Sequence, residues 1–162
     1  MARNPDGRIM NNKKNGLEDT SDIRLKRILN DTKTIAVVGA SADPARPSWQ
    51  VMKFLQSVGY RTIPVNPELA GRALHGERVY SSLSDIPEPF DMVDIFRRSD
   101  AVAAIIDETL SLASDHGTRT IWMQLGVHDD AAAARAMAAG IDVVKDHCPK
   151  VEYARLFSSA RS

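Results

Sequence analysis

Residues 34–47 read TIAVVGASADPARP, and they are the most informative part of the chain about its fold. The apolar run Ile35–Val38 closes at a glycine, which is typical of a short strand buried on both faces of a sheet. The small residues Gly39–Ser41 predict a narrow turn, and Ser48 is expected to cap the helix that follows. The amides of such a turn and of a first helical turn attract an anion, most often a phosphate. The stretch therefore predicts the nucleotide-binding element of a doubly wound α/β fold.

The rest of the chain continues the alternation of strands and helices. Apolar runs bounded by turn residues predict strands, and apolar residues at spacings of three and four predict helices. Ser21 or Asp22, then Asp100, then Asp129 or Asp130 are the expected N-caps, and Ile23, Ile28 and Leu29 are expected to pack under the first helix. The expected helices cover about 21–31, 48–58, 100–117, 129–139 and the end of 146–157. The expected strands cover 35–38, 60–65, 92–96, 120–125 and 141–144, with a short strand near 78–80 and a helical turn near 83–86 inside an irregular segment.

Length and composition narrow the class of protein. The 162 residues suffice for one domain, a net charge of zero does not favour a nucleic-acid binder, and no apolar run approaches membrane-spanning length. One cysteine, Cys148, excludes an internal disulfide and favours a reducing, cytoplasmic location. Polar residues 1–20 predict a flexible tail before a single Rossmann-like domain over 21–162, built on a mostly parallel sheet.

A ligand site is expected where the winding of the sheet reverses, between the first strand and the 92–96 strand. Three segments at the carboxyl ends of strands converge there, namely 39–47, 65–67 and 96–99. Arg46 and Arg72 can reach the same rim. Neighbours on an extended chain point oppositely, so one of Arg97 and Arg98 binds while the other pairs with an acid such as Asp94. For Gln124 and Gly126 a ligand role and simple strand termination both stay open. The predicted site residues are Gly39, Ala40, Ser41, Arg46, Ser48, Val65, Asn66, Pro67, Phe96, Arg97, Arg98 and Ser99.

The residues restrict the type of nucleotide. Gly39-Ala40-Ser41 lacks the second and third glycines of GxGxxG, and Asn66 stands where nicotinamide-cofactor folds usually place an acid. An amide cannot offer a charged bidentate acceptor to both ribose hydroxyls. A ligand with a phosphorylated ribose would avoid the repulsion that an acid causes there. NADP and coenzyme A (CoA) both satisfy this condition.

The segments TIAVVGAS, RPS, YRTIPVNP, ERVYSSLSDIPEPFDMVDIFRRS, TIWMQLG and GIDVVKDHCPKVE resemble, in order and spacing, the stand-alone CoA-binding domain family. That family is similar to the CoA-binding domain of the succinyl-CoA synthetase alpha subunit. The resemblance covers about 21–157 and implies binding of CoA or an acyl-CoA through its ADP part. By analogy, Gly39–Ser41 lie against the diphosphate or pantetheine, Asn66 and Pro67 beside the adenosine, and Phe96–Arg98 on the opposite wall. The synthetase continues into a phosphohistidine domain beyond the region of resemblance, so we do not expect its ligase activity here.

We expect no catalysis, so the chain would be a carrier, a sensor or an accessory of another enzyme. The alternatives are an NADP-dependent reductase, a subunit of an acyl-CoA ligase, or an interaction module without a ligand. Asp146, His147 and Cys148 are adjacent in sequence, which does not make a catalytic triad. Asp146, Cys148 and Glu152 match the family's closing motif, whose purpose the resemblance does not explain. A mixed disulfide between Cys148 and the ligand thiol is a further hypothesis. Scattered histidines predict no metal site.

Overall fold

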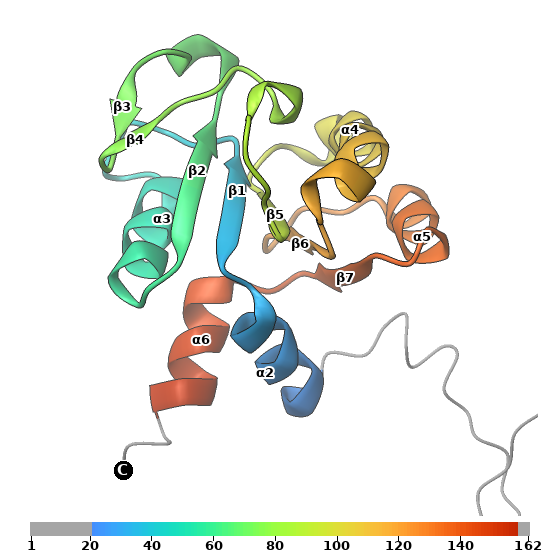
Figure 1. Cartoon of the computed structure of the whole chain (residues 1–162). Helices are drawn as coiled ribbons and strands as arrows, with labels where there is room; N and C mark the ends of the chain where they lie inside the picture. Colours follow the sequence, from blue (N-terminus) through green and yellow to red (C-terminus); the bar gives the residue numbers. More distant parts are fainter. Residues whose placement is uncertain (1–20, 159–162) are drawn as a thin grey trace, which may run out of the picture.

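A computed structural model describes residues 21–158 (Figure 1), so the prediction of a flexible tail over residues 1–20 lies outside the described residues. Five parallel strands form the main sheet in the order β2-β1-β5-β6-β7. β1 pairs with both β2 and β5, so the winding reverses beside β1 as predicted. The strands are β1 Thr34–Val38, β2 Arg61–Val65, β5 Met92–Ile95, β6 Thr120–Met123 and β7 Asp142–Lys145.

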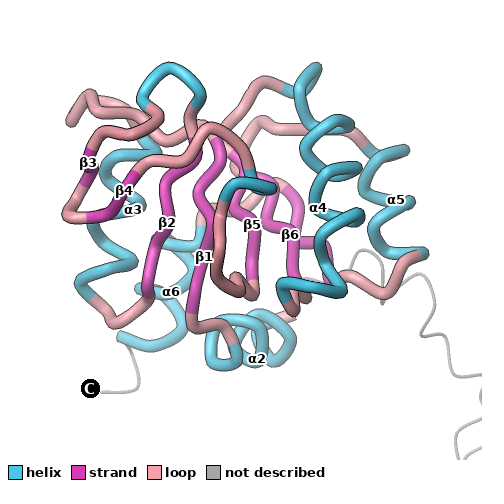
Figure 2. The backbone as a smooth tube through the Cα atoms, turned by 45° about the horizontal axis from the view of Figure 1, so that its top comes forward, coloured by secondary structure: helices cyan, strands magenta, loops and turns pink. Residues whose placement is uncertain are grey.

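Helices cover both faces of this sheet (Figures 1 and 2). α4 and α5 pack on one face, where their residues share an apolar cluster with Val38, Val65 and Ile95. α2, α3 and α6 pack on the other face, in a second cluster that contains Val37 and Trp122. Two cores explain why each strand is apolar on both sides. The helices are α2 Asp22–Asp31, α3 Pro47–Ser57, α4 Val102–His116, α5 Asp130–Ala138 and α6 Pro149–Ser158. The doubly wound, Rossmann-like α/β prediction is confirmed.

The segment between β2 and β5 is irregular, as its prolines and glycines predict. A short antiparallel pair, β3 Ala73–Leu74 and β4 Glu77–Arg78, lies where a single short strand was expected. Tyr80 then forms an isolated parallel bridge with Val65, beside the end of β2. One turn of 3-10 helix, η1 Pro67–Leu69, follows β2 directly, and a second, η2 Leu83–Asp85, matches the expected helical turn.

Some of the predicted helix N-caps are confirmed, and others are wrong. Ser21 caps α2, and the Asp129 side chain caps α5 by accepting from Ala132 N at 3.0 Å. Ser48 does not cap α3, because the helix begins one residue earlier at Pro47 and Arg46 is the N-cap. Proline suits the first helical position, since its fixed φ is helical and its missing N–H would have no partner. Asp100 caps no helix either, because it lies inside a 3-10 turn, η3 Ser99–Ala101, that leads into α4.

The buried side of α2 also differs from the prediction. Ile28 and Leu29 are buried as expected, but Ile23 is 84% exposed and Arg24 is buried in its place. The Arg24 guanidinium donates to Val143 O at 3.3 Å, at the edge strand β7. A long side chain with a charged tip can bury its stem in this way because its head reaches a backbone acceptor.

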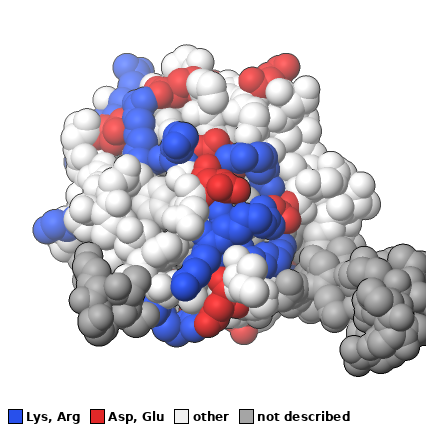
Figure 3. All heavy atoms as spheres, turned by 60° about the horizontal axis from the view of Figure 1, so that its bottom comes forward, with Lys and Arg blue, Asp and Glu red and all other residues white. Residues whose placement is uncertain are grey.

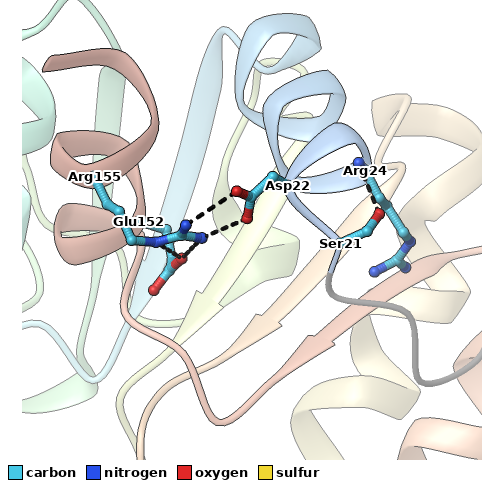
Figure 4. A network of polar contacts seen from close by, with 5 residues as sticks. All are labelled: Ser21, Asp22, Arg24, Glu152 and Arg155. Atoms are coloured by element: carbon cyan, nitrogen blue, oxygen red, sulfur yellow. Dashed lines mark hydrogen bonds and ion pairs between the residues drawn. The ribbon is translucent and has the colours of Figure 1, made fainter. Parts of the chain in front are cut away.

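Arg155 joins α6 to α2 (Figure 4). Its guanidinium donates to both carboxylate oxygens of Asp22, at 2.8 and 3.2 Å, and to Glu152 Oε1 at 2.7 Å. The hydrogen bonds from Arg155 hold the pKa of Asp22 below its ordinary value. The pair fixes the last turns of α6 against the start of α2, although the two segments are distant in sequence.

Charges of both signs alternate on the face at the amino ends of the strands (Figure 3). Arg27 reaches Asp142 at 3.3 Å, and Arg119 lies 3.6 Å from Asp91. Opposite charges that sit this close reduce the net field that the face presents to a distant charged partner.

No helix within residues 21–158 has the length and apolar character needed to cross a membrane.

Candidate functional site

A pocket of about 810 Å³ opens at the carboxyl edge of the sheet, where the winding reverses. Small-molecule sites span roughly 300–1,000 Å³, so the volume suits a ligand of nucleotide size. Residues that follow all five main strands contribute to it, together with the first turns of α3 and α6. Nine of the twelve residues predicted from sequence line the pocket: Gly39, Ala40, Ser41, Arg46, Ser48, Asn66, Pro67, Phe96 and Arg97.

The turn after β1 is held tightly against its neighbours. Gly39 has φ +91°, and a Cβ there would stand 2.9 Å from Phe96 O and 3.0 Å from Arg97 Cδ. Only glycine tolerates both the positive φ and this approach. The amides of Gly39 and Ala40 both donate to Val65 O, at 3.0 and 3.3 Å. These two amides therefore close the turn onto β2 and are not the anion donors that the sequence suggested.

Other amides remain for an anion. Within the described part of the chain, the backbone N–H groups of Ser41 and Ser48 donate no hydrogen bond, and both residues line the pocket. Ser48 is the second residue of α3 and is only 4% exposed. The unpaired amides at a helix start carry a partial positive charge. The anion-binding prediction, which named the amides of the turn and of the first helical turn, is thus narrowed to those of Ser41 and Ser48.

Asn66 connects two walls of the pocket. Its Nδ2 donates to Ala40 O at 2.8 Å, and its Oδ1 accepts from Glu68 N at 2.8 Å. The side chain therefore fixes the β1 turn and starts η1, in addition to lining the pocket. An acid at this position could not donate to Ala40 O, so the structure gives an internal reason for the amide found there.

Arg97 and Arg98 diverge, as the alternation of an extended chain predicts. Arg97 lines the pocket, whereas Arg98 is 89% exposed and lies 3.6 Å from Asp100. The prediction that one of these arginines pairs with Asp94 is wrong, because the acid beside Arg98 is Asp100. Ser99 and Val65 also lie outside the lining: Ser99 Oγ accepts from His128 N at 2.9 Å, and Val65 is buried behind the turn that its carbonyl holds. Arg72, expected at the rim, lines no part of the pocket.

Asp94 lies in the middle of the sheet, on β5, and is fully buried. Neither carboxylate oxygen has a hydrogen-bond partner among the described residues. Burial raises the pKa of Asp94 well above its ordinary value, because the charged form loses its hydration. The side chain faces the α3 and α6 side, like its cross-strand neighbours Val37 and Trp122.

The sequence prediction missed six lining residues, of which three follow β6 or β7 and three lie in α3 or after β2. Gln124, which the sequence left open, lines the pocket and is 7% exposed; its Oε1 has no partner within the described residues. Gly126, the other open residue, instead donates its N–H to Asp146 Oδ1 at 3.0 Å. Applying the strand-end rule to every strand would have found this side of the pocket. The missed residues are Pro47, Val51, Glu68, Leu125, Val127 and Val151.

The sequence Asp146-His147-Cys148 forms no triad. Asp146 Oδ1 is bonded to Gly126 N, and His147 Nδ1 contacts Lys145 O at 2.7 Å. Cys148 is a free, buried thiol that lines the pocket. Glu152 is buried and paired with Arg155. The structure thus gives Asp146 and Glu152 roles in holding the β7–α6 turn and α6, which the sequence left unexplained. In residues 21–158 no group of three or more His, Cys, Asp or Glu side chains could hold a metal ion.

The fold and the pocket are those of a Rossmann-like domain with a ligand-sized pocket at the switch point of its sheet. Residues 33–154 match the family model of the CoA binding domain, so the chain belongs to the CoA-binding domain family. The family resemblance drawn from the sequence is confirmed.

The chain is also similar to individual known proteins. Protein YneT of Bacillus subtilis is 37% identical over 138 residues, which cover 85% of this chain and 98% of YneT. A Thermus thermophilus structure, cell-free ID.343, is 40% identical with a TM-score of 0.80 and covers 85% of this chain and 100% of its own. The alpha subunit of an ADP-forming acetate–CoA ligase of Pyrococcus furiosus is 33% identical over 84 residues. That match covers 49% of this chain but 18% of the subunit.

Proposed function

We propose that the pocket binds CoA or an acyl-CoA through its ADP and diphosphate part, and that the chain has no catalytic activity of its own. The observation that carries the proposal is the pocket at the switch point, with Arg46 and Arg97 on its walls, in a chain of the CoA-binding domain family. Ligands of doubly wound sheets bind at this place.

The diphosphate would lie among cations and free donors. Arg46 precedes α3 and Arg97 follows β5, so guanidinium groups approach from two sides of the pocket. The unpaired amides of Ser41 and Ser48 add neutral donors between them. Charge-assisted hydrogen bonds from guanidinium to phosphate are stronger than neutral ones, so Arg97 is expected to contribute more than either amide.

Beyond Arg97, on the side away from the diphosphate, Gln124 is the residue that would bind the pantetheine arm. Gln124 lines the pocket, and its Oε1 is buried and accepts no hydrogen bond within the described residues. A buried acceptor without a donor is destabilising, and a ligand N–H would satisfy it once the side chain turns this oxygen toward the pocket. The pantetheine arm of CoA carries two amide N–H groups. An arm that donates to Gln124 would bring its thiol toward Cys148.

Two observations support the absence of catalysis. The side chains of Asp146 and His147 are engaged with backbone groups, so neither activates the Cys148 thiol. Nucleophilic catalysis needs a base within hydrogen-bond reach of the nucleophile. No histidine lines the pocket that the described residues form.

The experiment is calorimetric titration of the protein with CoA, NADP and NAD in parallel. We expect CoA to bind, and saturation at about a hundredfold above its Kd to stabilise the fold by about 2.7 kcal/mol. Arg97→Ala should weaken CoA binding by roughly tenfold or more, since a hydrogen bond to a charged group contributes about 1.5–3 kcal/mol. Arg98→Ala is the matched control, because it removes an adjacent guanidinium that lies outside the pocket. No CoA binding, or equal effects of the two variants, would contradict the proposal.

One alternative has a specific observation in its favour. The match to the alpha subunit of acetate–CoA ligase suggests a chain that presents CoA within a ligase assembly. Incubation of the protein alone with acetate, CoA and ATP should form no acetyl-CoA if catalysis belongs elsewhere. Acetyl-CoA formation by the purified chain would show that it is itself an enzyme.

A further inference from the structure

Exposed apolar side chains are concentrated at one end of the pocket. Three large apolar residues in the described part of the chain are strongly exposed: Ile23 at 84%, Leu125 at 61% and Val151 at 54%. Leu125 and Val151 both line the pocket, whereas Ile23 lies on α2, away from it. Single exposed apolar residues are ordinary, but two at the mouth of one pocket indicate a binding surface.

The turns that carry these residues are fixed to each other. Leu125 follows β6, and Val151 lies in the first turn of α6, directly after β7. β6 and β7 are neighbours in the sheet, and Gly126 N donates to Asp146 Oδ1 at 3.0 Å between the two turns. Leu125 and Val151 therefore reach the pocket from adjacent turns that are joined by a hydrogen bond, on the side where Cys148 lies.

The pocket has a polar end and an apolar end. Arg46, Asn66 and Glu68 follow β1 and β2, whereas Leu125 and Val151 follow β6 and β7. The strand order places β2 three strands from β6, and neighbouring strands are about 4.8 Å apart, so Leu125 is separated from Asn66 by roughly 14 Å. Val151 reaches the pocket from α6, which packs against α3. Arg97 lies between the two ends, after β5. A ligand that fills this pocket has an anionic nucleotide at one end and an apolar group at the other.

The geometry points to a CoA thioester with an aliphatic acyl chain as the preferred ligand, with the chain covered by Leu125 and Val151. The inference rests on the proposed function, because CoA supplies the anionic end. Free CoA ends in a thiol and would leave both side chains exposed to water. Each methylene that these side chains remove from water should tighten binding by up to about fourfold.

The test measures Kd by calorimetry for CoA, acetyl-CoA, butyryl-CoA and hexanoyl-CoA. For the natural chain we expect Kd to fall as the acyl chain lengthens, by at least tenfold between acetyl-CoA and hexanoyl-CoA. Leu125→Ser and Val151→Ser should each flatten this dependence, and Ile23→Ser is the matched control that should retain it. Circular dichroism and urea unfolding confirm that each variant folds.

The outcomes separate the two proposals. Failure of CoA itself to bind would overturn the proposed function. Binding of CoA with a Kd independent of acyl length would overturn this inference alone. A dependence on chain length that persists in both Leu125→Ser and Val151→Ser would also overturn it, because the chain would then be covered elsewhere.

Discussion

Replacing Gly39 by alanine tests the architecture of the site at its tightest point. The residue has φ +91°, and the new Cβ would stand 2.9 Å from Phe96 O and 3.0 Å from Arg97 Cδ. Gly59 is the matched control. It has φ +108° at the end of α3, and no heavy atom lies within 4 Å of the position that its Cβ would occupy. Both variants carry the backbone penalty, but only Gly39→Ala adds a collision with the backbone of the chain after β5.

The expected losses follow from these two contributions. A left-handed backbone costs a non-glycine residue about 1–2 kcal/mol, so Gly59→Ala should lower the free energy of unfolding by that amount. Overpacking costs about 1–3 kcal/mol more, so Gly39→Ala should lose roughly 2–5 kcal/mol in total. Because the collision displaces Arg97, Gly39→Ala should also weaken CoA binding, whereas Gly59→Ala should leave it unchanged.

Urea unfolding followed by tryptophan fluorescence measures the first quantity, and calorimetric titration with CoA measures the second. The same loss of stability in both variants, together with unchanged CoA affinity in Gly39→Ala, would refute the reasoning. It would show that the turn after β1 can move away from Phe96 and Arg97 without consequence for the pocket.

Burial raises the pKa of Asp94 above its ordinary 3.8, so the folded state keeps a proton that the unfolded state loses. As the pH rises from about 4 toward the folded pKa, the free energy of unfolding should therefore fall by about 1.4 kcal/mol per pH unit. In urea titrations at several pH values, Asp94→Asn should remove this slope. The exposed Asp115→Asn is the control and should keep it. An unchanged slope in Asp94→Asn would contradict the assignment of the pH dependence to Asp94. Cys148 is the sole cysteine, so maleimide labelling reports on the pocket alone and should slow in excess acetyl-CoA, which has no free thiol to consume the reagent. With CoA disulfide, attack by the Cys148 thiolate would release one CoA thiolate and add one CoA to the intact mass; an unchanged mass would remove the mixed-disulfide hypothesis.

The sequence predicted the part of the site that depends on local pattern. The apolar run before Gly39, the Asn66-Pro67 stop after β2 and the Arg97-Arg98 pair after β5 place three strand ends, and parallel strands meet at one edge. Nine predicted residues accordingly line the pocket. The lining after β6 and β7 was missed because Leu125 and Val151 are apolar residues whose side chains carry no chemistry that marks a site, although both lie in segments that resemble the family. Only the tertiary structure shows that they face the same space as Gly39.

The partners of individual polar groups were not predictable in the same way. The turn amides of Gly39 and Ala40 look free for an anion until Val65 O is brought beside them. Asp94 and Arg98 are close in sequence, yet one is buried in the sheet and the other is exposed. Which donor meets which acceptor depends on distances across strands, and a linear pattern does not contain those distances.

The amino-acid sequence by itself determined the order of strands and helices, the parallel sheet and the edge at which a ligand site belongs, because apolar periodicity and chain connectivity are local properties. Tertiary structure alone decided that Arg97 and not Arg98 lines the pocket, that Ser41 and Ser48 keep their amides unpaired, and that the opposite end of the pocket is apolar. These features arise from packing between segments far apart in the chain, which brings together groups that no spacing in the sequence relates.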